Sequence, residues 1–127
     1  MITKQVLIVD DEERLRELVQ ACLEDLAGWA TLSAKSGQEA LKLVREEAAA
    51  IDAILLDISM PDMDGFTVYE ELQANQASRA IPVVVLTAKV LPSDRARFAQ
   101  MGIAGVITKP FDPITIGDEV AKILGWS

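Results

Sequence analysis

Polar side chains suited to phosphate chemistry follow four separate apolar runs of the chain. They are Asp10 and Asp11, then Asp57, Thr87 and Lys109. If the runs are parallel strands of one sheet, these groups emerge at the same carboxyl edge, where open α/β sheets build their binding sites. The sequence therefore predicts one pocket that contains three carboxylates, a hydroxyl and an ammonium group.

Three carboxylates in one pocket need a positive partner. Two like unit charges about 4 Å apart repel by about 4 kcal/mol at an effective dielectric constant near 20. A hard divalent cation offsets this repulsion. Mg²⁺ suits such a site, because it binds few protein oxygens, retains several waters and completes its coordination with phosphate oxygens. We therefore expect a metal-assisted phosphate site with Mg²⁺ as the cofactor.

Each of these residues also has a purely structural explanation. Asp10 and Asp11 precede a predicted helix, where Asp is a preferred N-cap, so capping is an equal alternative for that pair. Capping explains Asp57 less well, because a loop follows it. Thr87 is also explained as a β-branched strand residue, and Lys109 as a solvated charge. We favour the functional interpretation because all four structural explanations would have to hold at once.

The elements that position these residues are short apolar runs alternating with helix-length segments. Strands are predicted at residues 6–9, 29–34, 53–56, 83–86 and 106–107. Helices are predicted at residues 12–26, 37–49, 65–75, 93–101 and 113–124, where apolar positions recur at intervals of three and four. This alternation implies an α/β fold with helices on both faces of a parallel sheet. The expected architecture is flavodoxin-like and doubly wound, with five strands in the order 2-1-3-4-5 and five helices.

Local signals mark several ends of the predicted helices. Gly28 follows the first helix, Ser36 precedes the second, and Asp112 places Pro113 at the first position of the last helix. Cys22 is the only cysteine. It falls in a helix-period series of apolar residues, so we interpret it as a buried hydrophobe rather than a redox group.

Length and composition limit the remaining functions. A chain of 127 residues fits one domain, expected to span residues 1–127 without an effector domain. The net charge of −8 argues against a nucleic-acid partner. No apolar stretch has the length needed to span a membrane, so we expect a cytoplasmic protein. The absence of histidine excludes Ser-His-Asp and Cys-His catalysis.

Four motifs together resemble the receiver domains of two-component response regulators, at the length of a stand-alone chemotaxis-type member. The motifs are Val9-Asp10-Asp11, Leu56-Asp57 with the segment 60–65, Leu86-Thr87-Ala88, and Lys109-Pro110-Phe111. The resemblance covers essentially the whole chain. It implies a phosphoryl-accepting signalling switch of a phosphorelay. Such a protein is not a conventional enzyme, because it catalyses only its own phosphorylation and slow dephosphorylation.

The resemblance also implies a role for each residue. Asp57 is the phosphoacceptor, and its donor is a phosphohistidine on a sensor histidine kinase or a phosphotransfer protein. Thr87 and Lys109 contact the phosphoryl oxygens. The groups that organise Mg²⁺ are Asp10, Asp11, Asp57 and the backbone carbonyl of Ser59. The position of Lys89, like that of Ser59, tunes hydrolysis of the acyl phosphate in this family.

The family's output surface corresponds to about residues 90–124. The resemblance implies that an unknown downstream protein, or a second copy of the chain in a homodimer, binds there. The chain departs from the family at Val106, where many members carry Tyr or Phe. The aromatic arm of the usual switch is therefore absent.

Two other functions are alternatives. A haloacid-dehalogenase-like phosphatase also uses an aspartyl nucleophile and Mg²⁺, but normally has a second Asp two positions on, where this chain has Ser59. A binding module of the same fold would not use the site at all. The three hypotheses predict, respectively, one covalent phosphoryl group on Asp57, multiple turnovers, or neither.

Overall fold

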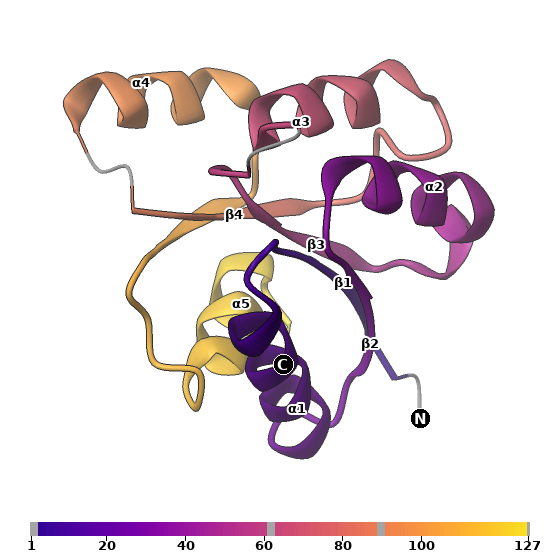
Figure 1. The fold of residues 1–127 in the computed structure, drawn as a ribbon, viewed down its shortest axis with the longest axis vertical. Coiled ribbons are helices and arrows are strands. Elements are labelled where there is room, and N and C mark those ends of the chain that lie inside the picture. Colours follow the sequence, from indigo (N-terminus) through magenta and orange to yellow (C-terminus); the bar gives the residue numbers. More distant parts are fainter. Residues whose placement is uncertain (1–2, 61–62, 89–90, 127) are drawn as a thin grey trace.

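The computed structural model contains a five-stranded parallel sheet between two layers of helices (Figure 1). The structure describes residues 3–60, 63–88 and 91–126. The strands are β1 (Gln5–Val9), β2 (Ala30–Ala34), β3 (Ala53–Asp57), β4 (Val83–Thr87) and β5 (Gly105–Thr108). The helices are α1 (Glu13–Asp25), α2 (Gly37–Glu47), α3 (Gly65–Ala74), α4 (Pro92–Met101) and α5 (Ile116–Leu124). All predicted strands and helices are present.

The strand order is β2-β1-β3-β4-β5, and every neighbouring pair is parallel. This order confirms the prediction. Helices α1 and α5 cover one face of the sheet, and α2, α3 and α4 cover the other (Figure 1). The order reverses between β1 and β3, so the ends of these two strands lie side by side at the carboxyl edge.

Alternating side chains of the strands divide the core between the two faces. On β1, Leu7 and Val9 pack on the side of α2, α3 and α4, whereas Val6 and Ile8 pack on the side of α1 and α5. β3 and β4 are buried along their whole length, as expected for parallel strands covered on both faces. Each such aliphatic side chain contributes roughly 1.5–3 kcal/mol of burial free energy, which makes the sheet a rigid base for the site.

The starts of α2 and α3 follow the N-cap rule. The hydroxyl of Ser36 accepts the N–H of Glu39 at 3.2 Å, at the helix start that the sequence predicted. The carboxylate of Asp64 accepts the N–H of Thr67 at 2.9 Å. Both bonds satisfy amide groups that have no partner within the helix. The second bond ends the loop that follows β3.

The start of α5 corrects the sequence prediction. Pro113 is not the first helical residue, because residues 113–115 form a turn and the helix begins at Ile116. In that turn the carboxylate of Asp112 accepts the N–H of Ile114 at 2.9 Å, and its carbonyl accepts the N–H of Thr115 at 3.1 Å. These local bonds hold the backbone in a separate turn ahead of the helix.

The interpretation of Cys22 as a buried hydrophobe is also corrected. Its neighbours Val19 and Leu23 are buried, but Cys22 itself is half-buried. Leu18 and Leu26 are 49% and 63% exposed. A helix that packs on one side of a sheet buries a narrow stripe, and this apolar series extends beyond the stripe.

Helix α2 is also shorter than the sequence predicted. α2 ends at Glu47, and a 3₁₀ turn over Ala48–Ala50 replaces its predicted last turn. Within the described ranges, no helix is long and apolar enough to cross a membrane.

Candidate functional site

The predicted polar residues lie at the carboxyl ends of neighbouring strands. Asp10 and Asp11 directly follow β1, Asp57 is the last residue of β3, Thr87 is the last residue of β4, and Lys109 follows β5. Because β1, β3, β4 and β5 are consecutive in the sheet, these ends share one edge. The chain thus brings residues from four distant segments to one place.

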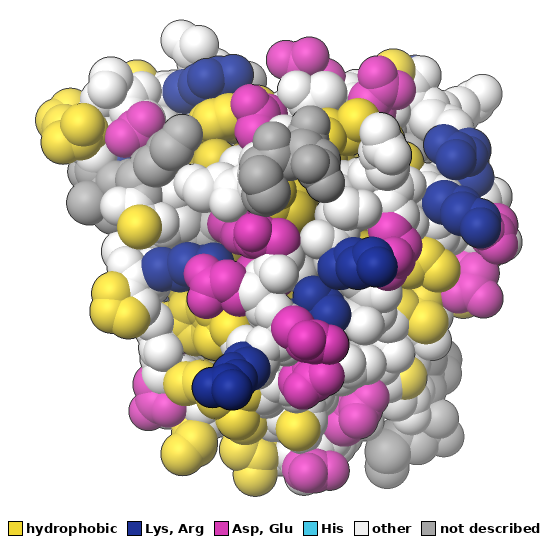
Figure 2. Space-filling view, viewed as in Figure 1, with side chains coloured by type: hydrophobic (Ala, Val, Ile, Leu, Met, Phe, Trp, Pro, Cys, Tyr) yellow, Lys and Arg dark blue, Asp and Glu magenta, His cyan; other side chains and the backbone are white. Residues whose placement is uncertain are grey.

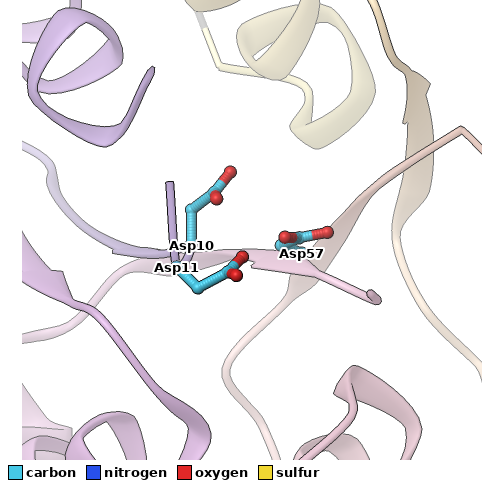
Figure 3. A group of neighbouring side chains, drawn as sticks. All are labelled: Asp10, Asp11 and Asp57. Carbon is cyan, nitrogen blue, oxygen red and sulfur yellow. The ribbon is translucent and has the colours of Figure 1, made fainter. Parts of the chain in front are cut away.

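Asp10, Asp11 and Asp57 form a compact carboxylate cluster (Figure 3). One carboxylate oxygen of each residue lies within 4.8 Å of the others. Figure 3 shows the side chain of Asp11 pointing across toward Asp57. Asp10 and Asp57 are buried, at 1% and 2% exposure, whereas Asp11 is exposed. The cluster is therefore embedded on one side and open to solvent on the other.

The cluster has the donor chemistry that Mg²⁺ prefers. Mg²⁺ binds oxygen at about 2.0–2.1 Å in an octahedron, so two oxygens on one ion are separated by about 4.2 Å at most. The oxygens here lie within 4.8 Å of one another, so small side-chain rotations suffice to bring them onto one ion. The exposed side, at Asp11, leaves room for waters or phosphate oxygens.

Lys109 balances the negative charge of the cluster. Its Nζ lies 3.1 Å from Asp10 Oδ2, 3.5 Å from Asp57 Oδ2 and 3.9 Å from Glu12 Oε1. Burial lowers the pKa of Lys109, but the nearby carboxylates of Asp57 and Asp10 raise it by more. The pKa therefore lies above its ordinary value, and the ammonium group stays charged. Side chains of both charges also lie side by side near the centre of the face seen in Figure 2.

Asp57 carries a perturbed carboxyl group. Burial raises the pKa of Asp57, the N–H of Ser59 (3.1 Å from Oδ1) and the charge of Lys109 lower it, and the charges of Asp10 and Asp11 raise it again. The result is a pKa of about 6. At neutral pH the group is therefore an ionised carboxylate in a site that disfavours its charge.

We expect the metal-free protein to gain stability from Asp57 as the pH falls from about 7 to about 5. The folded pKa of about 6 lies above the ordinary value of 3.8, so the folded state binds this proton more tightly. The cost of ionising Asp57 is complete above about pH 6 and absent below the ordinary pKa, and it amounts to about 3 kcal/mol. A little under half of this cost, about 1.3 kcal/mol, is recovered between about pH 7 and about pH 5, and thermal unfolding in EDTA across this range measures it.

Asp57→Asn is the control for that measurement, because an amide does not titrate. Its stability should vary less between about pH 7 and about pH 5 than that of the unaltered protein. The same pH dependence in both proteins would contradict the raised pKa of Asp57.

Thr87 and Ser59 occupy the predicted places, and their roles stay predictions. Thr87 is buried and is paired with Thr108 in the register of β4 with β5. Ser59 is exposed and its N–H faces Asp57. Lys89 lies outside the described residues.

Asp10 and Asp11 do not cap α1, although capping was an equal alternative on the sequence. The helix begins at Glu13, and its N-cap residue, Glu12, makes no side-chain capping bond. Instead, Asp10 Oδ1 accepts the N–H of Glu12 at 2.8 Å and closes the loop between β1 and the helix. The two carboxylates therefore lie in the cluster with Asp57 without capping the helix.

The sequence did not predict the structural roles of two residues that shape the site. Arg16 Nη1 donates to the carbonyl oxygen of Asp10 at 2.8 Å. At Gly65, an added Cβ would lie 2.7 Å from the carbonyl oxygen of Asp57 and 2.7 Å from Cα of Ile58, so the backbone there can approach β3 only without a side chain. Gly65 entered the sequence analysis only as the end of the motif segment 60–65, and Arg16 did not enter it, because a bond from a helix side chain to a backbone carbonyl has no local sequence pattern.

Val106 lies on β5 and is 37% exposed. Together with Phe98 and Ile103 it lines a hollow of about 470 Å³ between α4 and β5. The missing aromatic side chain thus coincides with open space on the predicted output face, residues 90–124.

Comparison with known proteins finds relatives over the whole chain. The family model "Response regulator receiver domain" matches residues 6–121. The polar-differentiation response regulator DivK of Brucella ovis is 35% identical over 124 residues, which cover 98% of this chain and 98% of DivK. The alkaline phosphatase synthesis transcriptional regulatory protein PhoP of Bacillus subtilis is 36% identical over 123 residues, which cover 97% of this chain and 49% of PhoP.

A solved structure agrees with these relatives. The chemotaxis response regulator CheY4 of Vibrio cholerae superposes with a TM-score of 0.87 at 29% identity, covering 96% of this chain and 99% of CheY4. The chain spans about half of the length of PhoP and nearly all of DivK and CheY4. None of these comparisons supports a haloacid-dehalogenase-like phosphatase.

Proposed function

Because the chain belongs to the response regulator receiver domain family, we propose that Asp57 is the phosphoacceptor of a signalling switch. The observation that carries the proposal is the convergence of three carboxylates and Lys109 at one edge of the sheet. The donor is a phosphohistidine on a sensor histidine kinase or a phosphotransfer protein. The phosphorylated chain then acts on a downstream protein.

The chemistry assigned to Asp57 is nucleophilic attack by a carboxylate oxygen on the phosphorus of the donor. The O–P bond forms as the N–P bond breaks, and the electron pair of the N–P bond returns to the imidazole nitrogen. This step needs ionised Asp57, and a pKa of about 6 leaves most of the group ionised at neutral pH.

The other site residues stabilise the charge of the transferred group. The groups that would hold Mg²⁺ are Asp10, Asp11, Asp57 and the backbone carbonyl of Ser59. Bound there, Mg²⁺ supplies positive charge beside the phosphoryl oxygens. Lys109, 3.5 Å from Asp57 Oδ2, would pair with one phosphoryl oxygen, and the hydroxyl of Thr87 would donate to another.

Switching follows from the charge that phosphorylation adds. A phosphoryl group brings up to about two negative charges and new acceptor oxygens, which compete with Asp10 and Glu12 for the ammonium group of Lys109. Lys109 lies within the predicted output face, residues 90–124, and Thr87 ends β4, the strand paired with β5 of that face. In this chain, the surface that changes includes the hollow beside Val106 rather than an aromatic ring. A downstream protein or a second copy of the chain would bind there.

Intact-mass measurement after incubation with Mg²⁺ and acetyl phosphate tests the proposal. The expected result is the addition of one phosphoryl group, which hydroxylamine removes because it is an acyl phosphate. Rapid release of many equivalents of phosphate, beyond the slow dephosphorylation of a receiver domain, would instead identify a phosphatase. An unchanged mass would identify a binding module that does not use the site.

Mg²⁺ should raise the unfolding temperature of the protein. A ligand that binds only the folded state contributes about 2.7 kcal/mol at a concentration about 100 times its dissociation constant. Asp11→Asn should abolish this response, and it should stabilise the metal-free protein because it removes one of three like charges. Thermal unfolding in Mg²⁺ and in EDTA measures both effects.

Asp25→Asn is the matched control, since it removes one exposed carboxylate at the end of α1, away from the cluster. It should retain the full response to Mg²⁺. A metal-free Asp11→Asn protein that is less stable than the unaltered chain would contradict repulsion within the cluster.

A further inference from the structure

We propose that Arg16 is a positioning residue for the Mg²⁺ site, and that it acts by holding the peptide group that joins Asp10 to Asp11. The inference rests on the proposed function, because it concerns the metal affinity of that same site. Arg16 is half-buried in α1, and its Nη1 donates to the carbonyl oxygen of Asp10 at 2.8 Å. It touches the backbone of the site and none of the predicted metal ligands' carboxylates.

Asp10 is held through every polar group that it has. Its N–H donates to the carbonyl of Ala34 at 3.1 Å, and its carbonyl accepts the bond from Arg16. Its Oδ1 accepts the N–H of Glu12 at 2.8 Å, and its Oδ2 accepts Lys109 Nζ at 3.1 Å. Arg16 therefore completes a set of contacts that fixes the conformation of a residue that is 1% exposed.

Asp11 depends on this arrangement more than Asp10 does. Its carboxylate is exposed, and no hydrogen bond from another described residue holds it. The carbonyl of Asp10 and the N–H of Asp11 belong to one planar peptide group, so a bond that orients the carbonyl also orients the backbone from which the Asp11 side chain leaves. Arg16 thus sets where the Asp11 carboxylate lies relative to Asp57.

α1 is a suitable support for this contact. Val19 and Leu23 of the same helix are buried against the sheet, so the helix that carries Arg16 is fixed to the strands that carry the site. Groups that orient metal ligands from outside the coordination sphere commonly change metal affinity by about 10-fold to 100-fold when they are removed. We expect Arg16 to contribute an effect in this range.

The charge of Arg16 and its positioning role predict opposite changes in the Mg²⁺ dissociation constant when Arg16 is removed. A guanidinium group near a cation site repels the cation, so charge alone predicts that Arg16→Ala binds Mg²⁺ more tightly. Positioning of the Asp10 peptide predicts weaker binding. The sign of the change in the dissociation constant therefore separates the two explanations.

Calorimetric titration with Mg²⁺ is the first measurement. Arg16→Ala should raise the dissociation constant by about 10-fold or more. Arg14→Ala removes the same charge from an exposed position of the same helix, and its dissociation constant should stay unchanged or fall. Arg16→Lys retains a charge and a donor and should recover part of the affinity. It also serves as the test variant if Arg16→Ala does not fold.

Amide NMR spectra of the metal-free proteins are the second measurement. The amide resonance of Asp11 should shift in Arg16→Ala and stay in place in Arg14→Ala, because only the former loses the bond to the adjoining carbonyl. Equal dissociation constants for the two variants, or an unshifted Asp11 amide, would overturn the inference and leave the proposed function intact. Failure of the unaltered protein to bind Mg²⁺ would overturn the metal site itself, and the inference with it.

Discussion

Asp57→Asn should incorporate no phosphoryl group under conditions in which the unaltered chain gains one. The amide lacks an anionic oxygen, and the neutral group is a poor nucleophile toward phosphorus. No other carboxylate of the cluster shares the position of Asp57, which is buried at the end of β3 beside both Lys109 and Ser59. Intact-mass measurement with Mg²⁺ and acetyl phosphate is the direct assay.

The same variant should be more stable than the unaltered protein when metal is absent. Asparagine has nearly the shape of aspartate, and it removes a buried charge whose pKa is raised to about 6. The expected gain near pH 7 is about 3 kcal/mol in the free energy of unfolding, measured by urea denaturation in EDTA.

Asp25→Asn, at an exposed position, should accept the phosphoryl group normally and show little change in stability. If Asp57→Asn gained mass as the unaltered chain does, another side chain would be the acceptor and the assignment to Asp57 would be wrong. Loss of phosphorylation together with a gain in stability is the signature of a functional group that the fold holds at an energetic cost.

Lys109→Met should destabilise the metal-free protein by roughly 3 kcal/mol at neutral pH. The substitution keeps an apolar stem of similar length but removes the ammonium group, which leaves the buried carboxylates of Asp10 and Asp57 without their cation. Lys109 is 16% exposed at its side chain, so we place the effect at the lower end of the range for a broken buried ion pair. Urea denaturation in EDTA measures the loss.

Two conditions should restore the stability of Lys109→Met. Mg²⁺ supplies positive charge to the same carboxylates, and acidification to about pH 5 protonates Asp57, whose pKa should rise further without Lys109. Lys42→Met, which removes an exposed ammonium group from α2, should show neither the loss nor the recovery. Unchanged stability of Lys109→Met in EDTA would contradict the role of Lys109 in balancing the cluster.

The ion pairs of Lys109 also describe the resting state of the proposed switch. In the unphosphorylated chain, one ammonium group is shared among Asp10, Asp57 and Glu12. A phosphoryl group on Asp57 would offer more negative charge than any of these carboxylates and would draw Lys109 away from Asp10 and Glu12. Because Lys109 follows β5 directly, this exchange occurs next to the hollow that Val106 leaves open.

The sequence by itself was sufficient for the architecture. Continuous apolar runs, helical periodicity and capping residues are local properties, and they placed all the strands and helices along the chain. The strand order followed from the general rule for doubly wound parallel sheets, and the structure confirms it. The exceptions were also local. At Asp112 the side chain and the carbonyl form a turn in competition with the helix, so α5 starts at Ile116 instead of Pro113.

The candidate site could be predicted for a related reason. Each predicted site residue lies at or just beyond the end of an apolar run: Asp10, Asp57, Thr87 and Lys109. In a parallel sheet the ends of these strands lie at the same edge, so the residues that follow them come together. This is how Lys109 and Asp10, 99 residues apart in the chain, come to lie 3.1 Å from each other.

Only the tertiary structure decided the finer properties of the site. The pKa of Asp57 depends on burial by surrounding segments, and the need for glycine at position 65 arises because its backbone packs against Asp57 across a loop. The bond from Arg16 to the Asp10 carbonyl depends on the angle at which α1 leaves β1. Electrostatic and steric energies vary over a few ångströms, and local sequence patterns specify which segments meet but not their separation at that scale.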